Sequence, residues 1–393
     1  MQKYLPKHSA DKSIVLPSLL TKKRKNYWQN KPSTWPDIRK SASDGHIYLL
    51  CDTRYPIGFV ASATGGYSVR IDGINYGNYN SEEQFSMSDW STYSTTNGYV
   101  IDYPTGATKA HIIDIYPQTE NENITAFHCA RVATSGAEEQ GLLWAHFNIS
   151  NAINLTSLLY TDSKYNNKKC MAITAKNNVL KVSGIRVMCK YALVLEYLPE
   201  INYGGLTFNS NTSFSFINNS KKITLKNGIA SLAVEMFLKN YALEQIKGDI
   251  VITAGANTFT DCRALKAFPN LDFTNSTNLN DFATNMPALQ DTVLDTRAGT
   301  KITKLGCYGT STYFMSGLKG LRISNEAPFD NATAPQINVS YTGLDRQALV
   351  QLFNDLPTVS DGQIIHIAGT TGASDLTEYE ALIPDTKGWT LTR

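Results

Sequence analysis

The segment Phe259-Thr-Asp-Cys262-Arg-Ala-Leu265-Lys-Ala-Phe-Pro-Asn-Leu271 contains the pattern that decides the fold of this chain. An aromatic residue is followed by a cysteine and then by an Ala-Leu pair, and related units recur after residue 155. Their leucines, spaced by 50, 22, 24 and 32 positions, are Leu193, Leu243, Leu265, Leu289 and Leu321. The apolar or aromatic residues before them are Val187, Phe237, Phe259, Phe282 and Phe314, and the intervening polar or cysteine residues are Cys189, Asn240, Cys262 and Asn285. Periods of about 20–29 residues with recurring Leu and Asn or Cys are typical of leucine-rich solenoids.

Before residue 155 the sequence is typical of an antiparallel β domain. Short apolar or alternating runs are separated by Gly, Pro, Asp and Thr, and Gly65-Gly66 and Asp72-Gly73 are typical of hairpin turns. Because no helical period lies between the runs, they predict a sandwich or barrel. The predicted strands are 46–51, 58–63, 67–71, 99–103, 110–116, 126–132 and 142–149. The stretch 73–98, rich in Asn, Ser, Tyr and Thr, is expected to form long loops or an insertion.

The C-terminal residues predict a closing unit for the solenoid. Apolar residues recur at helical spacing over 344–356, and Pro357 stops the run. A strand is expected over 364–367, Thr377 and Glu380 have the spacing of a capping box, and Trp389 lies in a final short strand.

The predicted fold class is mainly β with an α/β solenoid. An N-terminal antiparallel β-sandwich is followed by an irregular leucine-rich-repeat-like domain. We expect an extended N-terminal anchor at 1–40, the sandwich at 41–154, and the solenoid with its C-terminal cap at 155–393.

The composition excludes several classes of protein. The 393 residues exceed the ~250–300 of one hydrophobic core, so two or three domains are expected. With 36 Lys+Arg against 34 Asp+Glu, the pI of about 8.1 lies below the ~9 typical of a nucleic-acid-binding domain. No apolar run reaches the ~18 residues of a membrane-spanning helix. The N-terminus lacks the apolar core of a signal peptide, so we expect synthesis and folding in a cytoplasm.

The sequence contains no common motif of catalysis. It has no phosphate loop, dinucleotide-binding turn, zinc-protease helix or nucleophile elbow. Six cysteines, at 51, 129, 170, 189, 262 and 307, form no CxxC pair and are expected to be buried free thiols.

Histidines and paired carboxylates are the common catalytic side chains that the sequence offers. His111, His128 and His146 fall on three successive predicted strands and could converge on one face. Cys129 beside His128 points to the opposite face of its strand, so strand packing or solvent exposure of these histidines is the preferred interpretation over catalysis. The acidic clusters, interpreted as loops or solvated surface, are Glu82-Glu83, Glu138-Glu139 and Asp291/Asp295. We therefore expect no enzymatic activity, no metal and no cofactor.

Aromatic residues give the one positive indication of binding. Tyr76, Tyr79, Trp90 and Tyr93 lie among Asn, Ser and Gly, as on surfaces that bind sugars or proteins. The alternative is that these rings cover the core of the sandwich.

The first 40 residues are basic and interrupted by prolines, with Tyr27, Trp28 and Trp35 interspersed. The segment is too short for a core of its own, so these three rings are candidate anchors to a partner. The basic run 22–25 is interpreted as a solvated tether, with contact to nucleic acid or an acidic partner as the alternative.

Three stretches resemble known families. The repeats over 155–340, such as 259–271, resemble the BspA-type leucine-rich repeat. The tail resembles the closing unit of such repeats in tail and baseplate-associated proteins of tailed bacteriophages, through Leu349-Val-Gln-Leu-Phe-Asn-Asp-Leu-Pro and Lys387-Gly-Trp-Thr-Leu391. The front resembles their opening sandwich domain, through Lys31-Pro-Ser-Thr-Trp35-Pro, Phe59-Val-Ala-Ser-Ala and Tyr67-Ser-Val-Arg-Ile-Asp-Gly73. The Trp-Gly-Asp-Gly hairpin usual in that domain keeps its Asp-Gly here and loses its Trp.

The resemblance implies a structural protein of a phage virion, such as a tail fibre, a baseplate component or a capsid-decorating protein. Expected partners are other virion proteins and a host-surface glycan or protein, with a homo-oligomeric assembly, no nucleic acid and no membrane insertion. Two alternatives stay open. A bacterial adhesin would need an export signal or a lipidated cysteine near its start, whereas the first cysteine is Cys51. A virion-borne polysaccharide-degrading enzyme would need a carboxylate cluster.

Overall fold

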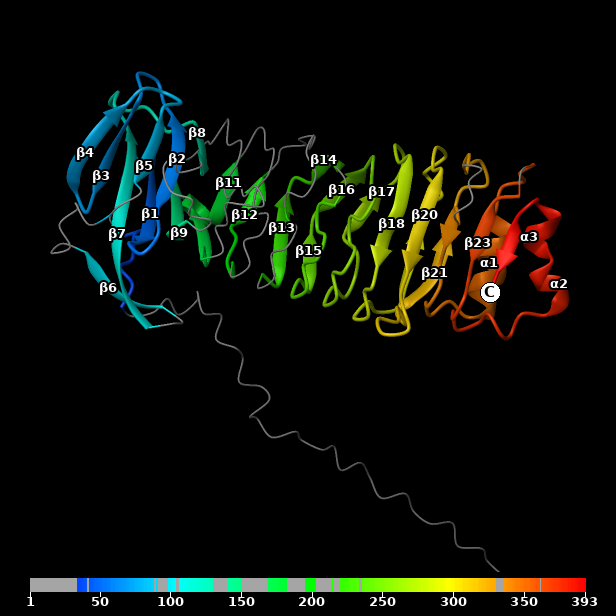
Figure 1. The fold of residues 1–393 in the computed structure, drawn as a ribbon. Helices are drawn as coiled ribbons and strands as arrows, with labels where there is room; N and C mark the ends of the chain where they lie inside the picture. The colour runs from blue at the N-terminus through cyan, green and yellow to red at the C-terminus, as the bar shows by residue number, and fades with distance from the viewer. Residues whose placement is uncertain are drawn as a thin grey trace, which may run out of the picture.

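The structure is a computed structural model of the 393-residue chain. It describes residues 34–40, 42–87, 90, 98–103, 106–129, 140–149, 169–181, 195–202, 214, 220–232, 235–329, 335–360 and 362–393. Within these residues the chain is mainly β and includes a β-solenoid of about seven turns. Figure 1 shows an elongated arrangement, with an N-terminal unit of longer strands at one end and helices near the other.

The N-terminal unit contains two sheets that share one hydrophobic core. Its strands are β1 His46–Asp52, β2 Ile57–Ser62, β3 Tyr67–Ile71, β4 Ile74–Tyr79, β5 Gln84–Met87, β6 Tyr99–Tyr103, β7 Gly106–Pro117, β8 Ala126–Cys129, β9 Leu142–Asn148 and β10 Ala172–Ala175. The larger sheet has the order β10-β9-β1-β7-β3-β4, with β6 also paired to β7, and the smaller has the order β5-β2-β8. Phe127 of the smaller sheet meets Phe147 of the larger edge to face, with ring centroids 5.7 Å apart. All seven strands predicted between 46 and 149 are present, with small shifts of their ends.

The stretch 73–98, expected to form loops or an insertion, contains two strands instead. β4 pairs with β3 across the turn at Asp72 and Gly73, both with positive φ, and β5 pairs with β2. No residue of β4 is buried. The hydrophobic alternation that marks the other strands is therefore missing from it, and the prediction of a loop was wrong for this reason.

Residues at the end of the predicted N-terminal anchor cover the outer face of the larger sheet. Trp35 and Ile38 are 2% and 1% exposed, in a second hydrophobic cluster that includes Trp144 of β9. Asp37 holds the guanidinium of Arg39 through hydrogen bonds of 2.9 and 2.8 Å, and that guanidinium lies over the Trp144 ring, 5.5 Å from its centroid. This part of the segment is therefore packed on the N-terminal unit.

β10 joins the N-terminal unit to the solenoid. Residues 172–175 pair in parallel with 144–147 of β9, whereas the other strand pairs of the larger sheet are antiparallel. Ala172 also forms a parallel bridge with Tyr197 in the following turn. The larger sheet thus continues into the solenoid, and one hydrophobic cluster extends through both parts.

The solenoid consists of short parallel strands that stack in successive turns (Figure 1). Its elements are β11 Val179–Lys181, β12 Glu200–Asn202, β13 Lys222–Lys226, β14 Ile229–Leu232, β15 Gln245–Lys247, β16 Asp249–Ile252, β17 Asn270–Asp272, β18 Asn278–Thr284, β19 Thr292–Asp295, β20 Lys304–Tyr308, β21 Leu318–Arg322, β22 Ile337–Asn338, α1 Arg346–Asp355, β23 Ile364–His366, α2 Glu378–Ala381, α3 Ile383–Thr386 and β24 Thr390–Thr392, with a short 3₁₀ turn at Lys176–Asn178. The strand orders are β11-β12-β13-β15, β14-β16-β17, β18-β20-β22-β23-β24 and β19-β21. Paired residues lie from 20 positions apart, at Leu232 and Ile252, to 32 apart, at Leu305 and Ile337.

A column of phenylalanine rings runs through the solenoid core. Phe214, Phe237, Phe259 and Phe282 are fully buried, and successive centroids lie 5.6, 5.5 and 5.3 Å apart. The first two contacts are stacked and the third is edge to face. The aromatic position of the sequence repeat therefore fills the space between consecutive turns.

At two units of the repeat, the polar or cysteine side chain bonds its turn to the one before it. Asn240 donates through Nδ2 to the carbonyl of Phe214 at 2.7 Å, and Cys262 donates through Sγ to the carbonyl of Phe237 at 3.0 Å. Both side chains are fully buried, so these bonds supply partners for carbonyls that water does not reach.

The leucines expected at 243, 265 and 289 are buried, but the last repeat is displaced. Leu289 donates its N–H to the carbonyl of Met286 at 3.2 Å, and Leu318 makes the same bond to Met315 at 3.1 Å. Leu318, rather than the expected Leu321, is thus the equivalent residue. The segment between β20 and β21 is longer than the segment between β18 and β19, and this extra length shifts the repeat.

The C-terminal end is closed by the helices α1 to α3. Thr377 and Glu380 form the expected capping box at the start of α2. Trp389 is 1% exposed and donates its indole N–H to the carbonyl of Pro357 at 2.8 Å. α1 packs against β21, so it occupies the place that a strand takes in earlier turns.

The cysteines within the described residues are free thiols in the core, as expected. They are Cys51, Cys129, Cys170, Cys262 and Cys307, whereas Cys189 lies outside the described residues. Burial raises the pKa of Cys262 to about 12, so this thiol stays neutral at physiological pH.

Candidate functional site

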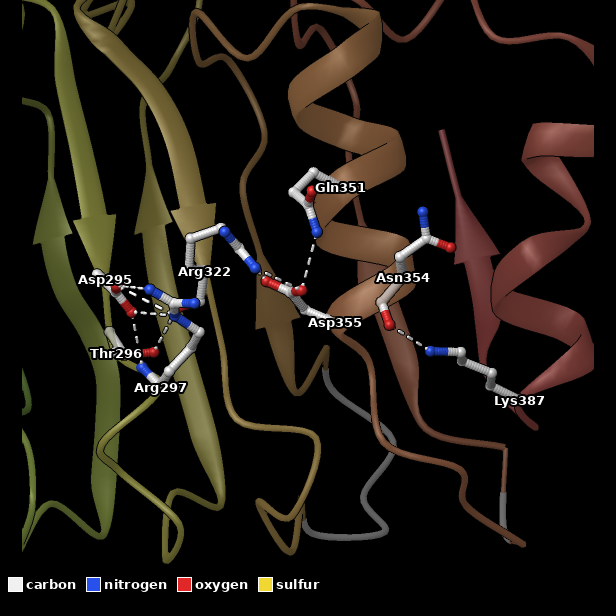
Figure 2. A network of polar contacts seen from close by, with 8 residues as sticks. All are labelled: Asp295, Thr296, Arg297, Arg322, Gln351, Asn354, Asp355 and Lys387. Carbon is white, nitrogen blue, oxygen red and sulfur yellow. Dashed lines mark hydrogen bonds and ion pairs between the residues drawn. The ribbon is translucent and has the colours of Figure 1, made fainter.

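A network of charged side chains crosses successive turns near the C-terminal end of the solenoid (Figure 2). It begins at Asp295, the last residue of β19. The carboxylate of Asp295 accepts hydrogen bonds from Nε and Nη2 of Arg297 at 2.9 and 2.5 Å, and from the backbone N–H of Arg297 at 3.1 Å. These bonds hold the pKa of Asp295 below its usual value. Asp295 therefore fixes both the backbone and the guanidinium of Arg297.

The loop that carries Arg297 is attached to the next turn. Thr296 donates through its backbone N–H and through Oγ1 to the carbonyl of Arg322, at 2.8 and 2.9 Å. The side chain of Thr296 is fully buried. The position of the Arg297 backbone is thus set by the strand β21 as well as by Asp295.

Arg322 extends the network from β21 to α1. Its guanidinium pairs with both carboxylate oxygens of Asp355, with 3.1 Å from Nη2 to Oδ1. Gln351, one helical turn earlier in α1, donates to the same carboxylate at 3.0 Å. Because the Asp355 side chain is only 11% exposed, this ion pair is partly desolvated and holds the helix against the strand.

Lys387 closes the network at the C-terminal end of α1. Its ammonium donates to the carbonyls of Asn354 and Leu356 at 2.6 and 2.7 Å. The last carbonyls of a helix have no intrahelical partner and form its negative pole, so a cation is favourable there. Burial lowers the pKa of Lys387.

An open pocket of about 390 Å³ lies beside this network, within the size range of ligand sites. Its walls are the loop after β19, the loop after β21 and the C-terminal end of α1. The lining residues are Arg297, Thr300, Ile323, Ser324, Asn325, Glu326, Asn354 and Asp355. All but Ile323 are polar or charged, and together they present both donors and acceptors. The pocket therefore suits a ligand that forms many hydrogen bonds.

A second open pocket, of about 490 Å³, lies at the N-terminal end of α1. Its lining residues are Asp345, Arg346, Gln347, Val350, Asp375 and Glu380. The guanidinium of Arg346 binds the carboxylate of Glu380, with 2.9 Å from both Nε and Nη2. That pairing, with bonds from Thr377, lowers the pKa of Glu380 to about 2. This cluster fastens α2 to α1.

The structure places the candidate surface aromatics in different environments. Tyr76 on β4 is 46% exposed, and Tyr79 is half-buried against the core. Trp90 is 5% exposed, and its ring stacks on His111 with centroids 5.3 Å apart. Tyr93 lies outside the described residues. Of the three described rings, Tyr76 is the most exposed, and it meets Phe85 edge to face with ring centroids 5.7 Å apart.

Of the candidate anchors, Tyr27 and Trp28 lie outside the described residues. Trp35 is described, and its ring is buried on the outer face of the larger sheet. In this position Trp35 contributes to the core of the N-terminal unit.

The three histidines do not converge. His111 lies opposite Cys51 of β1 and faces the shared core, whereas His146 lies opposite Tyr48 and faces the outer cluster. The two imidazoles are therefore on opposite faces of the larger sheet. His128 belongs to β8 in the smaller sheet.

The acidic pairs noted in the sequence do not form a site among the described residues. Asp295 is engaged by Arg297, and Glu83 accepts hydrogen bonds from the backbone and side chain of Asn80 at 2.8 and 3.0 Å. Glu138 and Glu139 lie outside the described residues. In the described part of the chain, no group of three or more His, Cys, Asp or Glu side chains could hold a metal ion.

The pocket beside α1 was not predicted from the sequence, but one local signal points to its Arg297. An Asp-x-Arg pair, in which the arginine donates at least two side-chain N–H groups to the aspartate, occurs at Asp37/Arg39, Asp52/Arg54, Asp261/Arg263 and Asp295/Arg297. We call this arrangement an Asp-Arg fork. Such a fork holds a guanidinium in a defined orientation, which is a useful property in a binding site.

Within the described ranges no helix is long and apolar enough to cross a membrane. Comparison with family models, curated proteins and solved structures finds no match to this chain. The fold and the pocket are therefore the basis for a functional proposal.

Proposed function

We propose that this chain is a structural protein of a bacteriophage virion that displays a rigid surface for assembly or for binding to the host. The observation that carries the proposal is the single hydrophobic cluster that extends from the N-terminal unit through the solenoid to Trp389. Turns that share one core cannot bend independently, so the whole rod holds its surface at a fixed distance from its base. The resemblance of the front and tail of the sequence to tail and baseplate proteins supports a place in a virion.

We also propose a finer description of the fold. Two sheets around Phe59 and Phe127 support a β-sandwich for the N-terminal unit. The unit Phe-x-x-Asn/Cys-x-x-Leu, at 237–243 and 259–265, supports irregular leucine-rich repeats of the BspA type.

In this proposal the residues before Trp35 attach the protein to other virion proteins. Trp35 itself packs on the larger sheet, so the anchoring role is assigned to Tyr27, Trp28 and their neighbours. Several copies in a symmetric assembly would convert weak contacts at the solenoid surface into high avidity.

Immunogold electron microscopy of purified particles, with an antibody raised against residues 235–329, tests the proposal. Label on the tail or baseplate supports a role in host binding, and label on the capsid supports a decorating role. Absence of label from all particles contradicts the virion proposal and favours an adhesin. Deletion of residues 1–33 should abolish incorporation into particles while the purified protein keeps its circular dichroism spectrum.

A further inference from the structure

We infer that the pocket formed by the loops after β19 and β21 and by the end of α1 is a carbohydrate-binding site for a pyranose unit of a surface polysaccharide. Arg297 orients the sugar. The inference deepens the proposed function and rests on it for the source of the sugar.

The Asp-Arg forks differ in what lies on the face of the guanidinium. Three of the four forked guanidiniums lie over aromatic rings: Arg39 over Trp144 at 5.5 Å, Arg54 over Tyr55 at 5.8 Å, and Arg263 over Tyr313 at 4.0 Å. Arg297 has no such ring contact within the described residues. Its side chain is 53% exposed and lies at the wall of the pocket. The flat face of a fixed guanidinium is therefore open to a ligand at this one fork.

The charges that line the pocket are of both signs. The cation of Arg297 is accompanied by the carboxylates of Glu326 and Asp355. Behind the wall, Arg322 is already paired with Asp355. There is no excess of positive charge that would select a phosphate or an acidic peptide. Because Ile323 is the single apolar residue of the lining, the pocket offers no cluster of apolar side chains that would anchor a peptide side chain.

The hydrogen-bonding groups of the lining match those of sugar hydroxyls. A hydroxyl both donates and accepts, and so does the side-chain amide of Asn325 or Asn354. The carboxylate of Glu326 accepts from hydroxyls, and the guanidinium of Arg297 donates to them. A ring that carries several hydroxyls can satisfy all of these groups together.

The walls are held in place before any ligand arrives. Thr296 fixes the loop of Arg297 to β21. On the opposite wall, Ser324 accepts the backbone N–H of Glu326 through Oγ at 3.2 Å, and its carbonyl accepts the N–H of Ala327 at 3.3 Å. Rigid walls lower the entropy that binding must overcome, so even a small sugar can be retained.

Saturation-transfer NMR on the full-length protein tests the site. The probes are the methyl pyranosides of glucose, galactose, mannose, N-acetylglucosamine and galacturonic acid. We expect transfer to at least one of them, and a dissociation constant about tenfold higher for Arg297→Ala and for Asn325→Ala, as the loss of one strong hydrogen bond implies. Lys301→Ala is the matched control, since it removes an exposed basic side chain of the same turn outside the pocket and should leave binding unchanged.

Absence of transfer from all five probes, or equal affinities for Arg297→Ala and the parent protein, would overturn the inference. So would binding of a polyglutamate peptide that depends on Arg297 while no sugar binds. The proposed function fails separately. If the protein binds a sugar but no particle is labelled, the carbohydrate site stands and the virion proposal fails. If particles are labelled but no sugar binds, the virion proposal stands and the carbohydrate site fails.

Discussion

The ammonium nitrogen of Lys387 lies 2.6 Å from the carbonyl oxygen of Asn354, so the last loop of the protein contacts the end of a helix some thirty residues earlier in sequence. A second bond, of 2.7 Å, reaches the carbonyl of Leu356. One side chain thereby supplies partners and a positive charge to the C-terminus of α1. The folding of the final turn is coupled to the stability of the turn before it.

Replacement of Lys387 by methionine keeps the apolar stem and removes the charge. We expect the free energy of unfolding to fall by about 1 kcal/mol, because two carbonyls lose their donor and the helix loses a favourable cation. Guanidinium denaturation measures the change. Lys301→Met, at an exposed position, is the control, and equal midpoints for the two variants would contradict the capping role.

The stability of the β9–β10 junction should depend on pH through His146. Burial lowers the pKa of this imidazole to about 4, whereas an unfolded histidine titrates near 6.5. Between these values the unfolded state binds the proton more strongly, so this contribution to stability is complete above pH 6.5 and is lost as the pH falls towards 4. The loss approaches about 3 kcal/mol.

Denaturation at pH 7.5 and pH 4.5 checks this expectation. His146→Gln should show a smaller loss of stability between the two pH values than the parent protein. Thr174→Val removes the hydroxyl that lies 2.8 Å from Nδ1 but keeps the imidazole, so it should retain the pH dependence. The same pH dependence in His146→Gln as in the parent would show that another group is responsible.

The phenylalanine column should carry much of the stability of the solenoid. Phe259→Ala removes a fully buried ring with neighbours on both sides, and we expect a cost of about 3–5 kcal/mol. Phe268, in the same turn, is only partly buried, so Phe268→Ala should cost clearly less. Thermal unfolding of both variants tests the ranking, and a reversed order would refute it.

Two glycines near β21 should respond differently to a methyl group. A Cβ on Gly317 would lie 1.6 Å from the carbonyl oxygen of Leu289, and backbone on both sides would have to move. A Cβ on Gly320 would meet the side chain of Val293 at 3.2 Å, which can adjust. We expect Gly317→Ala to cost about 3 kcal/mol or more and Gly320→Ala about 1 kcal/mol or less. Chemical denaturation measures the unfolding free energy of both variants. Similar losses of stability for Gly317→Ala and Gly320→Ala would contradict the close backbone approach at Gly317.

The two best-placed rings of the 73–98 stretch can be separated by mutation. Trp90→Ala should destabilise the N-terminal unit by about 3–5 kcal/mol. The substitution removes a buried indole that stacks on His111 and donates a hydrogen bond of 2.9 Å to the backbone carbonyl of Tyr55. Tyr76→Ala, at an exposed position, should change stability by about 1 kcal/mol or less. Melting temperatures of the variants test this, and a larger effect at Tyr76 would contradict the assignment.

Much of the fold could be predicted because local patterns repeat. Phe237 and Phe259 hold the same place in successive turns, and Thr377 with Glu380 meets the geometric requirement of a capping box within four residues. The run Ile-Tyr-Leu-Leu-Cys of β1 is apolar at every position, which is typical of a strand covered on both faces. The same pattern indicates that another segment covers the outer face of the sheet, and in the structure Trp35 lies there.

The pocket could not be predicted in the same way. Arg297, Asn325 and Asn354 lie about thirty residues apart in sequence, and each is an ordinary polar residue after a strand or in a helix. Only the stacking of three turns brings these residues together. The register of those turns depends on the lengths of the segments between the strands, which vary from turn to turn. The repeat leucine expected at Leu321 corresponds to Leu318 in the structure, so the sequence-based register is wrong by three residues in this turn.

The parallel pairing of β10 with β9 also gives the folding reaction a direction. A solenoid turn is stable only on a finished neighbour, and the first turn is normally the costly one to nucleate. Here the larger sheet, built earlier in the chain, supplies that neighbour as a template. Turns can then be added one by one to that template, and Trp389 covers the core in the turn that contains β24.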